Sequence, residues 1–309
     1  MKQKTNKNLL EEKGISTINQ LRKYIHDCFK GLHFNEEAHA YTHSNQTLVS
    51  TSKFISAYSK PFDARQMSIL KSKSSTKGML GDRRTPEYYR KRWEYLRDES
   101  TNKGSRVHMY AECYPKFDPP ACNKEQAILD FFKWVEDNEY SVIMLELRMH
   151  DLECGKAGTT DGLLFDKKNK EILMFDFKTN EADLFKYYGK LLKPFNSLVD
   201  SKYNKYTLQA GDYTYMFEKA TGLIVNKKMI VWINDKDFSS AEYKRQAVKP
   251  SVDKSFKIYE LEDLSDKLRS ESIRRSEELK SGSKRVLDTS KLSKPKSLTK
   301  SLTKPKKRK

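Results

Sequence analysis

The alternation of apolar and polar residues predicts β-strands most clearly in the middle of the chain. Between residues 140 and 178, the segments YSVIMLEL, TTDGLLF and EILMFDFK are short, rich in apolar residues and bounded by polar turns. Near residue 230, KKMIVWIN has the same character. Segments whose apolar residues recur every three or four positions flank these strands, as in helices with one buried face. This order of helices, hairpin strands, helices and strand predicts a mixed α/β core.

Helical spacing recurs along much of the remaining chain. Thr85 followed by Pro86 is typical of a helix start, with a capping hydroxyl and a proline at the first helical position. This helix is expected to run toward Asp98, and a second one to begin at Ser100 or Thr101 and to carry NKGSRVHMYAECY. The other predicted helices are residues 1 to about 32, KEQAILDFFKWVEDN, LFKYYGKLLKP, SKYNKYTLQAGDYTYMFEKATG with Gly222 as its C-cap, and residues 261–280.

The two ends of the chain differ in character from its centre. HFNEEAHAYTHSNQTLVSTSKFI predicts short extended pieces that lead into a helix capped near Ser50 or Thr51, and the polar residues 71–84 predict a mobile loop. Beyond Ser281, repeated S-L-T-K units with lysine and proline predict disorder. The expected organisation is a helical and extended N-terminal extension (1–84), a core (85–260), a charged helix (261–280) and a disordered basic tail (281–309).

Charge favours a polyanionic partner. The 309-residue chain is 37% hydrophobic, which is enough apolar material for a sizeable core, and its formal net charge is +18. Residues 284–309 hold eleven Lys or Arg and one acid, so the tail contributes +10 and the body retains +8. An excess of this size on the body favours nucleic acid as a partner.

Several classes of protein are excluded by what the sequence lacks. No apolar run approaches the roughly 20 residues that span a bilayer, and the N-terminus has no apolar signal-peptide core. We therefore expect a soluble, cytoplasmic protein that is not secreted, and a nuclear one if the host is eukaryotic, since PKKRK resembles an import signal. The four cysteines form no Cys-x-x-Cys pair, which argues against a zinc ribbon and a disulfide framework. They are interpreted as free thiols. Gly155-Lys156 lacks the glycine spacing of an ATP-binding phosphate loop.

The hairpin TTDGLLFDKKNKEILMFDFK places two acids in strand-like sequence. If Asp166 pairs with Glu171 across the loop KKNK, the antiparallel register brings Asp161 opposite Asp176. Residues opposed across two strands hold their Cβ atoms about 5 Å apart, and like charges placed there destabilise a sheet unless a cation neutralises them. Lys178 lies two positions beyond Asp176 on the same face, because strand side chains alternate. Two carboxylates and one ammonium are therefore expected to converge.

This combination suits phosphodiester hydrolysis. Oxygen ligands hold Mg²⁺ or Mn²⁺, the metal activates water and screens phosphate, and Lys178 orients the water or stabilises charge. A single D-x-K in a strand is more often a solvated charge pair, so the motif alone is weak. Glu146, in the strand before the hairpin, either extends the coordination shell or is a solvent-facing glutamate, and the sequence leaves both open.

Four motifs in order resemble the PD-(D/E)XK nuclease superfamily, in its RecB-like exonuclease branch, over roughly residues 85 to 235. GSRVHMYAE resembles the histidine helix of that branch, TTDG and FDFK resemble the two halves of its acidic site, and QAGDY resembles its Q-x-x-x-Y signature. HFNEEAHAY and TSKFI resemble the N-terminal part of phage-encoded members. The resemblance implies a restriction-endonuclease-like core.

The resemblance also implies roles for individual residues. It makes His108, Asp161, Asp176 and the backbone carbonyl of Phe177 metal ligands, with Asp161, Asp176 and Lys178 as the catalytic residues. It makes Gln209 and Tyr213 DNA-contacting residues, and the alternative is that they are interior helix residues whose polar ends are satisfied. A histidine ligand favours Mn²⁺ relative to an all-oxygen site.

Two positions depart from the family pattern. Thr160 stands where the superfamily name has proline, at a position that is often variable. The cysteines of the iron–sulfur members, which follow the Q-x-x-x-Y helix, are missing here, so no iron–sulfur cluster is expected.

The expected function is that of a metal-dependent deoxyribonuclease. An exonuclease in DNA recombination, repair or processing is favoured, with DNA and a separate helicase, recombinase or single-strand-binding protein as partners. An endonuclease of the same fold and a noncatalytic DNA-binding or assembly protein remain as alternatives. The aromatic, basic run KYYGKLLKPFNSLVDSKYNKY would line a strand-binding groove or simply pack in the core.

Overall fold

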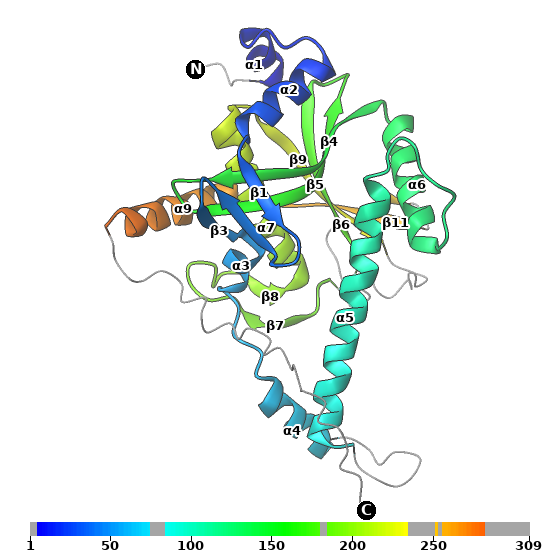
Figure 1. Ribbon diagram of the computed structural model, residues 1–309, viewed down its shortest axis with the longest axis vertical. Coiled ribbons are helices and arrows are strands. Elements are labelled where there is room, and N and C mark those ends of the chain that lie inside the picture. Colours follow the sequence, from blue (N-terminus) through cyan, green and yellow to red (C-terminus); the bar gives the residue numbers. More distant parts are fainter. Residues whose placement is uncertain (1–4, 75–83, 180–183, 234–250, 253–254, 282–309) are drawn as a thin grey trace, which may run out of the picture.

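The computed structural model describes residues 5–74, 84–179, 184–233, 251–252 and 255–281. A twisted central sheet has helices on both faces, and the long helix α5 extends away from the body toward α4 (Figure 1). The described elements are α1 (Asn6–Glu12), α2 (Ile18–Cys28), β1 (Leu32–Asn35), β2 (Ala40–His43), β3 (Gln46–Ser50), α3 (Thr51–Ser56), α4 (Ala64–Ser74), α5 (Pro86–Ala111), α6 (Asn123–Asp137), β4 (Tyr140–Asp151), β5 (Lys156–Asp166), β6 (Glu171–Lys178), β7 (Tyr187–Lys190), β8 (Val199–Ser201), α7 (Lys202–Thr221), β9 (Val225–Ile233), β10 (Ser251–Val252), β11 (Phe256–Glu260) and α9 (Ser265–Lys280).

The central sheet is mixed. Its described strands follow the order β1-β2-β3-β5-β6-β9-β11-β10, with β4 paired to β5 outside this path. The β3–β5 and β6–β9 pairs are parallel, whereas the other pairs are antiparallel. Strands β7 and β8 form a separate small sheet. The predicted α/β class, with a central mixed sheet flanked by helices, is confirmed.

Two apolar clusters hold helices against opposite faces of the sheet. In one, Leu163 and Met174 pack with residues of α1, α2 and α7, among them Ile25 and Met216. In the other, the residues next in sequence, Leu164 and Phe175, pack with the end of α5 and with α6. Because successive strand residues point to opposite faces, β5 and β6 are buried on both sides. The hairpin is therefore the centre of the core.

One edge of β5 changes partner along its length. Strand β4 pairs with β5 from Lys156 to Asp166 and occupies one edge. On the other edge, β3 pairs with residues 156 and 157, and β6 pairs with residues 162 to 166. Residues 158–161 lie between these two partners, without a ladder partner on that edge among the described residues. We call this interval the fork of the sheet.

The predicted helix ends are largely confirmed. Ser50 caps α3 through the N–H of Lys53, and Thr85 caps α5 through the N–H of Tyr88. Gly222 closes α7 in the left-handed conformation, with φ of 69°. That conformation favours glycine, which explains why the helix ends there.

The prediction of two helices between Thr85 and Cys113 was wrong, because α5 is one continuous helix. The hydroxyl of Thr101 does not cap a new helix but donates to the carbonyl of Arg97 at 3.0 Å, one turn earlier. Ser105 donates in the same way to Thr101 at 3.1 Å. Such bonds satisfy a mid-helix hydroxyl without interrupting the helix.

The prediction of a helix over LFKYYGKLLKP was also wrong. This segment contains β7, which pairs with β8. Gly189 has a φ of 113°, which no helical residue adopts. Leu184 and Leu191 are both buried, but in two different clusters, so their helical spacing does not reflect one helix face.

The chain ends differ in smaller ways from the predictions. Residues 5–31, predicted as part of one helical segment, contain two helices, α1 and α2, before the chain enters β1. Residues 71–74 belong to α4, and the rest of the predicted mobile loop, 75–83, lies outside the described residues. Helix α9 begins at Ser265 rather than at residue 261, and the predicted disordered tail lies outside the described residues except for residue 281.

The cysteines are as predicted. Cys28, Cys113, Cys122 and Cys154 are all free thiols. Among the described helices, none combines the length and apolar composition that a membrane crossing requires.

Candidate metal centre

The β5–β6 hairpin has the predicted register. Asp166 pairs with Glu171 across the loop 167–170, and the ladder continues to the pair of Gly162 and Phe175. The next position in this register would bring Asp161 level with Asp176, but the backbone ladder ends before it. The two strands part here, at the fork.

Side-chain hydrogen bonds replace the backbone ladder at the fork. Thr160 Oγ1 donates to the carbonyl of Phe175 at 3.1 Å, and Asp161 Oδ2 accepts the N–H of Phe177. The side chain of Asp161 is only 8% exposed. Its position is fixed by the neighbouring strand, which leaves its other oxygen directed at α5.

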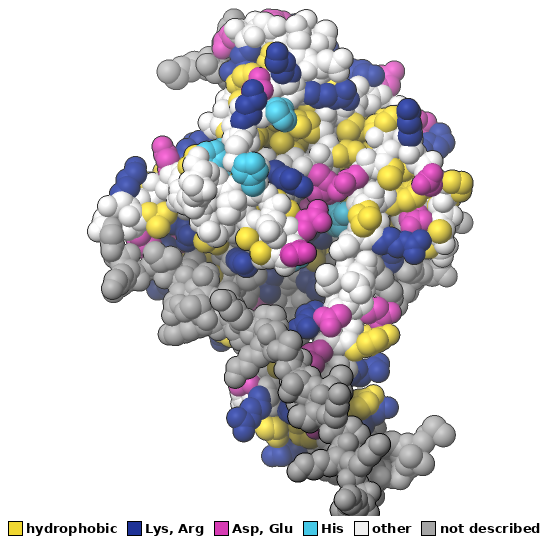
Figure 2. Space-filling model, in the orientation of Figure 1, with side chains coloured by type: hydrophobic (Ala, Val, Ile, Leu, Met, Phe, Trp, Pro, Cys, Tyr) yellow, Lys and Arg dark blue, Asp and Glu magenta, His cyan; other side chains and the backbone are white. Residues whose placement is uncertain are grey.

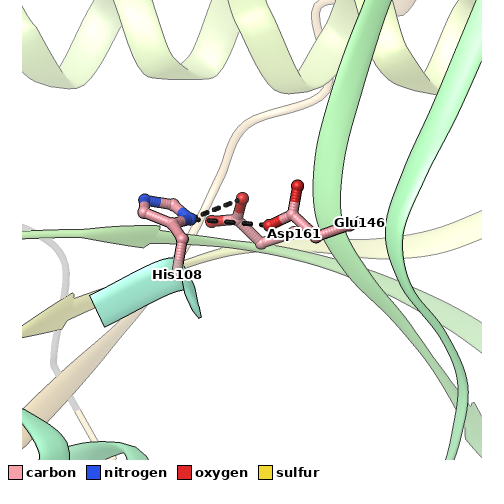
Figure 3. A group of neighbouring side chains, drawn as sticks. All are labelled: His108, Glu146 and Asp161. Carbon is pink, nitrogen blue, oxygen red and sulfur yellow. Dashed lines mark ion pairs between the residues drawn. The ribbon is translucent and has the colours of Figure 1, made fainter. Parts of the chain in front are cut away.

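Three side chains converge at this point (Figure 3). His108 Nδ1 lies 3.1 Å from Asp161 Oδ1 and 3.6 Å from Glu146 Oε1. One ligand atom from each residue lies within 4.8 Å of the others. The imidazole comes from α5 and the carboxylates come from β4 and β5, so three separate elements build one cluster. We call it the metal cluster.

Glu146 joins this cluster through an unusual backbone conformation. Its φ is 48°, in the left-handed region that strand residues other than glycine rarely adopt. Leu145 packs with the α6 side of the sheet, whereas Leu147 packs with the α7 side. In a regular strand these two leucines would share a face. The conformation of Glu146 therefore rotates the strand, so that the side chains after it point to the opposite face. Strain of this kind persists only where the surroundings enforce it, and it concentrates at functional sites.

His108 is held by the last turn of α5. The neighbouring residues Val107, Tyr110 and Ala111 are buried against α6 and the sheet. The imidazole makes an edge contact with the ring of Phe177, with 6.4 Å between ring centroids. This packing fixes the helix while the imidazole of His108, itself about one-third exposed, faces the carboxylates.

Asp176 lies beside the metal cluster but pairs with Lys178. Its Oδ2 forms an ion pair with Lys178 Nζ, and both side chains are largely buried. As predicted, Asp176 and Lys178 share a face of β6, while Phe175 and Phe177 point to the opposite face, into the apolar cluster on the α6 side. Lys178 Nζ also lies 4.7 Å from the ring centroid of Tyr206.

The pKa values report a strongly negative site. The charge of Asp161 is the main cause that raises the pKa of His108 to about 11, against a smaller opposing effect of burial. Burial, followed by the charge of Asp161, raises the pKa of Asp176 to about 6. Burial would lower the pKa of Lys178, but the charges of Asp176 and Asp161 outweigh it and raise that pKa. A positive charge is therefore strongly favoured among these acids.

The donor set fits a divalent cation. One imidazole nitrogen and two carboxylates, with a third carboxylate adjacent, match the ligands of Mn²⁺ and, for the oxygens, of Mg²⁺. Figure 2 shows acidic side chains and a histidine gathered on the face where α5 passes the central strands of Figure 1. A metal held there would have one side open to a substrate, since His108 and Glu146 are each about 30% exposed.

Gln209 and Tyr213 lie on α7, on the other side of the fork. Gln209 Nε2 donates to the hydroxyl of Tyr213 at 2.7 Å. Tyr213 is only 3% exposed, and its ring packs directly over Gly158, where there is no space for a Cβ atom. Tyr213 therefore supports β5 where the fork begins, and Gln209 is the more accessible of the two side chains.

Sequence reasoning singled out neither the strained conformation of Glu146 nor the role of Tyr206. The strain leaves no local signal, because glutamate has no preference for positive φ. Tyr206 lies one helical turn before Gln209, so the spacing of the Q-x-x-x-Y motif, extended backward by three residues, would have indicated it.

Comparisons with known proteins show weak similarity to solved structures. No protein-family model matches the chain, and no curated protein matches it. Among solved structures, it is similar to an alkaline exonuclease, LHK-Exo, from Laribacter hongkongensis, with 11% sequence identity and a TM-score of 0.31. The match covers 79% of this chain and 92% of that one. A likeness this low does not place the chain in a family.

Proposed function

We propose that this protein is a divalent-metal-dependent deoxyribonuclease of the PD-(D/E)XK type, which hydrolyses phosphodiester bonds. The observation that carries the proposal is the metal cluster of His108, Glu146 and Asp161, with the ion pair of Asp176 and Lys178 on the adjacent strand. Carboxylates and an imidazole that can hold a dication, with a lysine beside them, suit phosphodiester hydrolysis, and a net positive charge suits a polyanionic substrate.

The residues of the metal cluster would hold Mg²⁺ or Mn²⁺. Asp161 and Glu146 would supply oxygen ligands and His108 a nitrogen ligand, and we propose Asp176 and the carbonyl of Phe177 as further ligands. When bound, the dication would lower the pKa of water and screen the charge of the phosphate. The buried hydrogen bond from Phe177 would keep the Asp161 carboxylate in place throughout the reaction.

Lys178 would act as a fixed positive charge. Its raised pKa keeps the ammonium protonated, so it is unsuited to accept a proton at neutral pH. Asp176 and the ring of Tyr206 hold it at the edge of the metal cluster. From there it would orient the attacking water and stabilise negative charge on the phosphate.

Gln209 would position the DNA strand, and Tyr213 would hold Gln209 in place. The hydrogen bond between the two side chains and the burial of Tyr213 support this division of roles. We further propose that the enzyme is an exonuclease acting in DNA recombination, repair or processing, beside a separate helicase, recombinase or single-strand-binding protein.

The test is metal-dependent cleavage of linear and covalently closed circular DNA by the purified protein. We expect nucleotide release from linear DNA with Mn²⁺ or Mg²⁺ and none with a chelator. Asp161→Asn, Asp176→Ala and Lys178→Ala should each reduce the rate by about a hundredfold or more, because the first two weaken the hold on the metal and the third removes a positive charge at the reacting phosphate.

Matched controls come from α6. Asp137 and Lys133 form an exposed ion pair at 3.0 Å, so Asp137→Asn and Lys133→Ala make the same charge changes away from the metal cluster. Both should retain the parental rate. Cleavage of circular DNA would show an endonuclease instead, and full activity of Asp176→Ala or Lys178→Ala would refute the assignment.

A further inference from the structure

Arg148 is an exposed cation beside the metal cluster. It lies on β4 two residues after Glu146, which separates their Cα atoms by about 7 Å along a strand. Leu147, between them, is buried on the α7 side of the sheet, so Arg148 points away from that side. Within the described residues, no carboxylate lies within ion-pair distance of its guanidinium.

The N-terminal hairpin, formed by β1 and β2, holds this guanidinium in place. Arg148 Cζ lies 5.6 Å from the ring centroid of Phe34 on β1. The Phe34 ring in turn packs on Tyr41 of β2, with 4.6 Å between centroids. Tyr41 is anchored to the central sheet by a 2.8 Å hydrogen bond between its hydroxyl and Thr159 Oγ1. An arginine over an aromatic ring is partly immobilised, yet its N–H groups stay available.

The same elements connect Arg148 to the metal cluster. Arg148 pairs with Thr159 across β4 and β5, and the same register brings Glu146 level with Asp161 two positions away. The charges of Arg148 and Glu146 both act on the Tyr41 hydroxyl, although burial is the main cause that raises the pKa of Tyr41. The guanidinium therefore lies at the rim of the acidic site rather than on a remote surface.

A polyanion faces a difficulty at this site that Arg148 would resolve. The acids that hold a metal repel the phosphates on either side of the one being cleaved. The guanidinium of Arg148, two residues after Glu146 on β4, offers paired N–H groups that match a phosphate's oxygens.

We propose that Arg148 binds the phosphate next to the scissile one, and that Phe34 of the N-terminal hairpin positions it for this contact. This rests on the proposed nuclease function and gives the N-terminal extension a part in substrate binding. Arg148 is then a substrate-binding residue, and Phe34 is a positioning residue.

The first test compares Arg148→Ala with Arg92→Ala. Arg92 is exposed on α5, about 24 Å along the helix from His108, so its loss makes the same charge change away from the site. We expect Arg148→Ala to raise KM about tenfold with kcat nearly unchanged, and to reduce the salt dependence of DNA binding by about one unit of slope. Equal values for the two variants would overturn the proposal.

Two more variants separate charge from geometry. Arg148→Lys keeps the charge but loses the forked donors, so KM should rise while the salt slope is retained. Phe34→Leu keeps apolar packing but removes the aromatic ring, and we expect a KM increase of about threefold. If Arg148→Ala unfolds at a much lower temperature than the parent protein, Arg148→Lys becomes the test. A parental KM in Arg148→Lys would contradict the proposed contact.

A modified substrate tests the partner atom directly. A neutral methylphosphonate placed at either linkage flanking the cleaved bond should weaken binding to the parent protein about tenfold at one of them. The same substitution should cost Arg148→Ala nothing further, whereas equal losses in both proteins would overturn the assignment. Substrates with a 5′-phosphate or a 5′-hydroxyl distinguish a terminal phosphate from an internal one.

The failure of this inference can be told from failure of the proposed function. Without metal-dependent cleavage by the parent protein, the nuclease proposal fails. The affinity for uncleaved DNA as a function of salt still compares Arg148→Ala with Arg92→Ala in that case.

Discussion

At the scale of single residues, Glu146 combines a strained backbone with an acid in a negatively charged site. Both features oppose stability: a left-handed conformation costs about 1–2 kcal/mol for a residue with a Cβ atom, and like charges repel. The conformation lets Leu145 and Leu147 pack on opposite faces of the sheet, but this packing does not require a carboxylate at residue 146. The combination is explained if the function requires a carboxylate at the residue where the side chains of β4 change faces.

This reasoning predicts different effects for two substitutions of Glu146. Glu146→Gln and Glu146→Gly should both weaken Mn²⁺ binding, by about 10- to 100-fold, because each removes one carboxylate ligand. Glu146→Gly should be about 1 kcal/mol more stable toward unfolding than Glu146→Gln, because glycine adopts this φ without strain. Calorimetric metal titration and urea unfolding measure the two quantities. Lower stability of the glycine variant would show that the backbone conformation stores no strain.

At the scale of elements, a buried polar network joins α9 to the sheet and to α7. Lys156, at the start of β5, forms a fully buried ion pair with Asp212 of α7. Lys156 Nζ also donates to Ser272 Oγ of α9 at 2.7 Å, and Asp212 accepts from Thr51 of α3 at 2.8 Å. Four elements therefore meet at one charge pair, close to the fork.

Breaking this pair on one side should be strongly destabilising. Lys156→Met leaves the carboxylate of Asp212 buried without its cation, and we expect a loss of about 3–5 kcal/mol in the free energy of unfolding. The double variant Lys156→Met/Asp212→Leu should recover most of that loss, because it removes both charges. Urea denaturation of the three proteins measures the effect. A double variant no more stable than Lys156→Met would mean that the network acts through hydrogen bonds rather than charge.

The elements also show which features the sequence could predict. The hairpin register followed from residues 161–176 alone, because a four-residue loop sets it locally, and the start of α5 and the end of α7 were found from the caps Thr85 and Gly222. Glu146 stayed ambiguous because its conformation depends on the packing of Leu145 and Leu147 on opposite faces. The pairing of Lys156 with Asp212 joins residues far apart in sequence, and no local pattern announces it. The assignment of roles within the site remains a prediction.

At the scale of the whole molecule, buried carboxylates with lowered pKa values make stability depend on pH. Asp151 is buried, which alone would raise its pKa, but hydrogen bonds from Cys154 and Lys219 outweigh burial and lower it. Asp166 behaves likewise, held by the N–H groups of Asn169 and Lys168. For such groups the unfolded chain binds protons more readily, so they stabilise the fold above about pH 4 and lose this contribution as the pH falls through the lower folded pKa.

Asp151→Asn should therefore destabilise the protein near neutral pH and much less in acid. Lys219 Nζ donates to both carboxylate oxygens of Asp151, at 2.9 and 3.0 Å, and this charge-assisted contact is lost in the variant. We expect a loss of about 1.5–3 kcal/mol at pH 7, which shrinks below about pH 4. Urea unfolding at pH 7 and pH 3 measures it, with Asp137→Asn as the exposed control. A loss of the same size at both pH values would show that packing, not ionisation, is responsible.

The parallel pairing of β3 with β5 has a consequence for how the chain acquires its shape. Strands β1 to β3 are synthesised early, yet β3 pairs with β5 through Val49 and Ser50, whose partners Lys156 and Ala157 leave the ribosome much later. Contacts so distant in sequence close slowly, because a long loop must be ordered first. During translation, the N-terminal hairpin must wait unattached until the β4–β5–β6 meander has emerged. A ribosome-bound chain that stops before β5 would thus expose an apolar hairpin to chaperones.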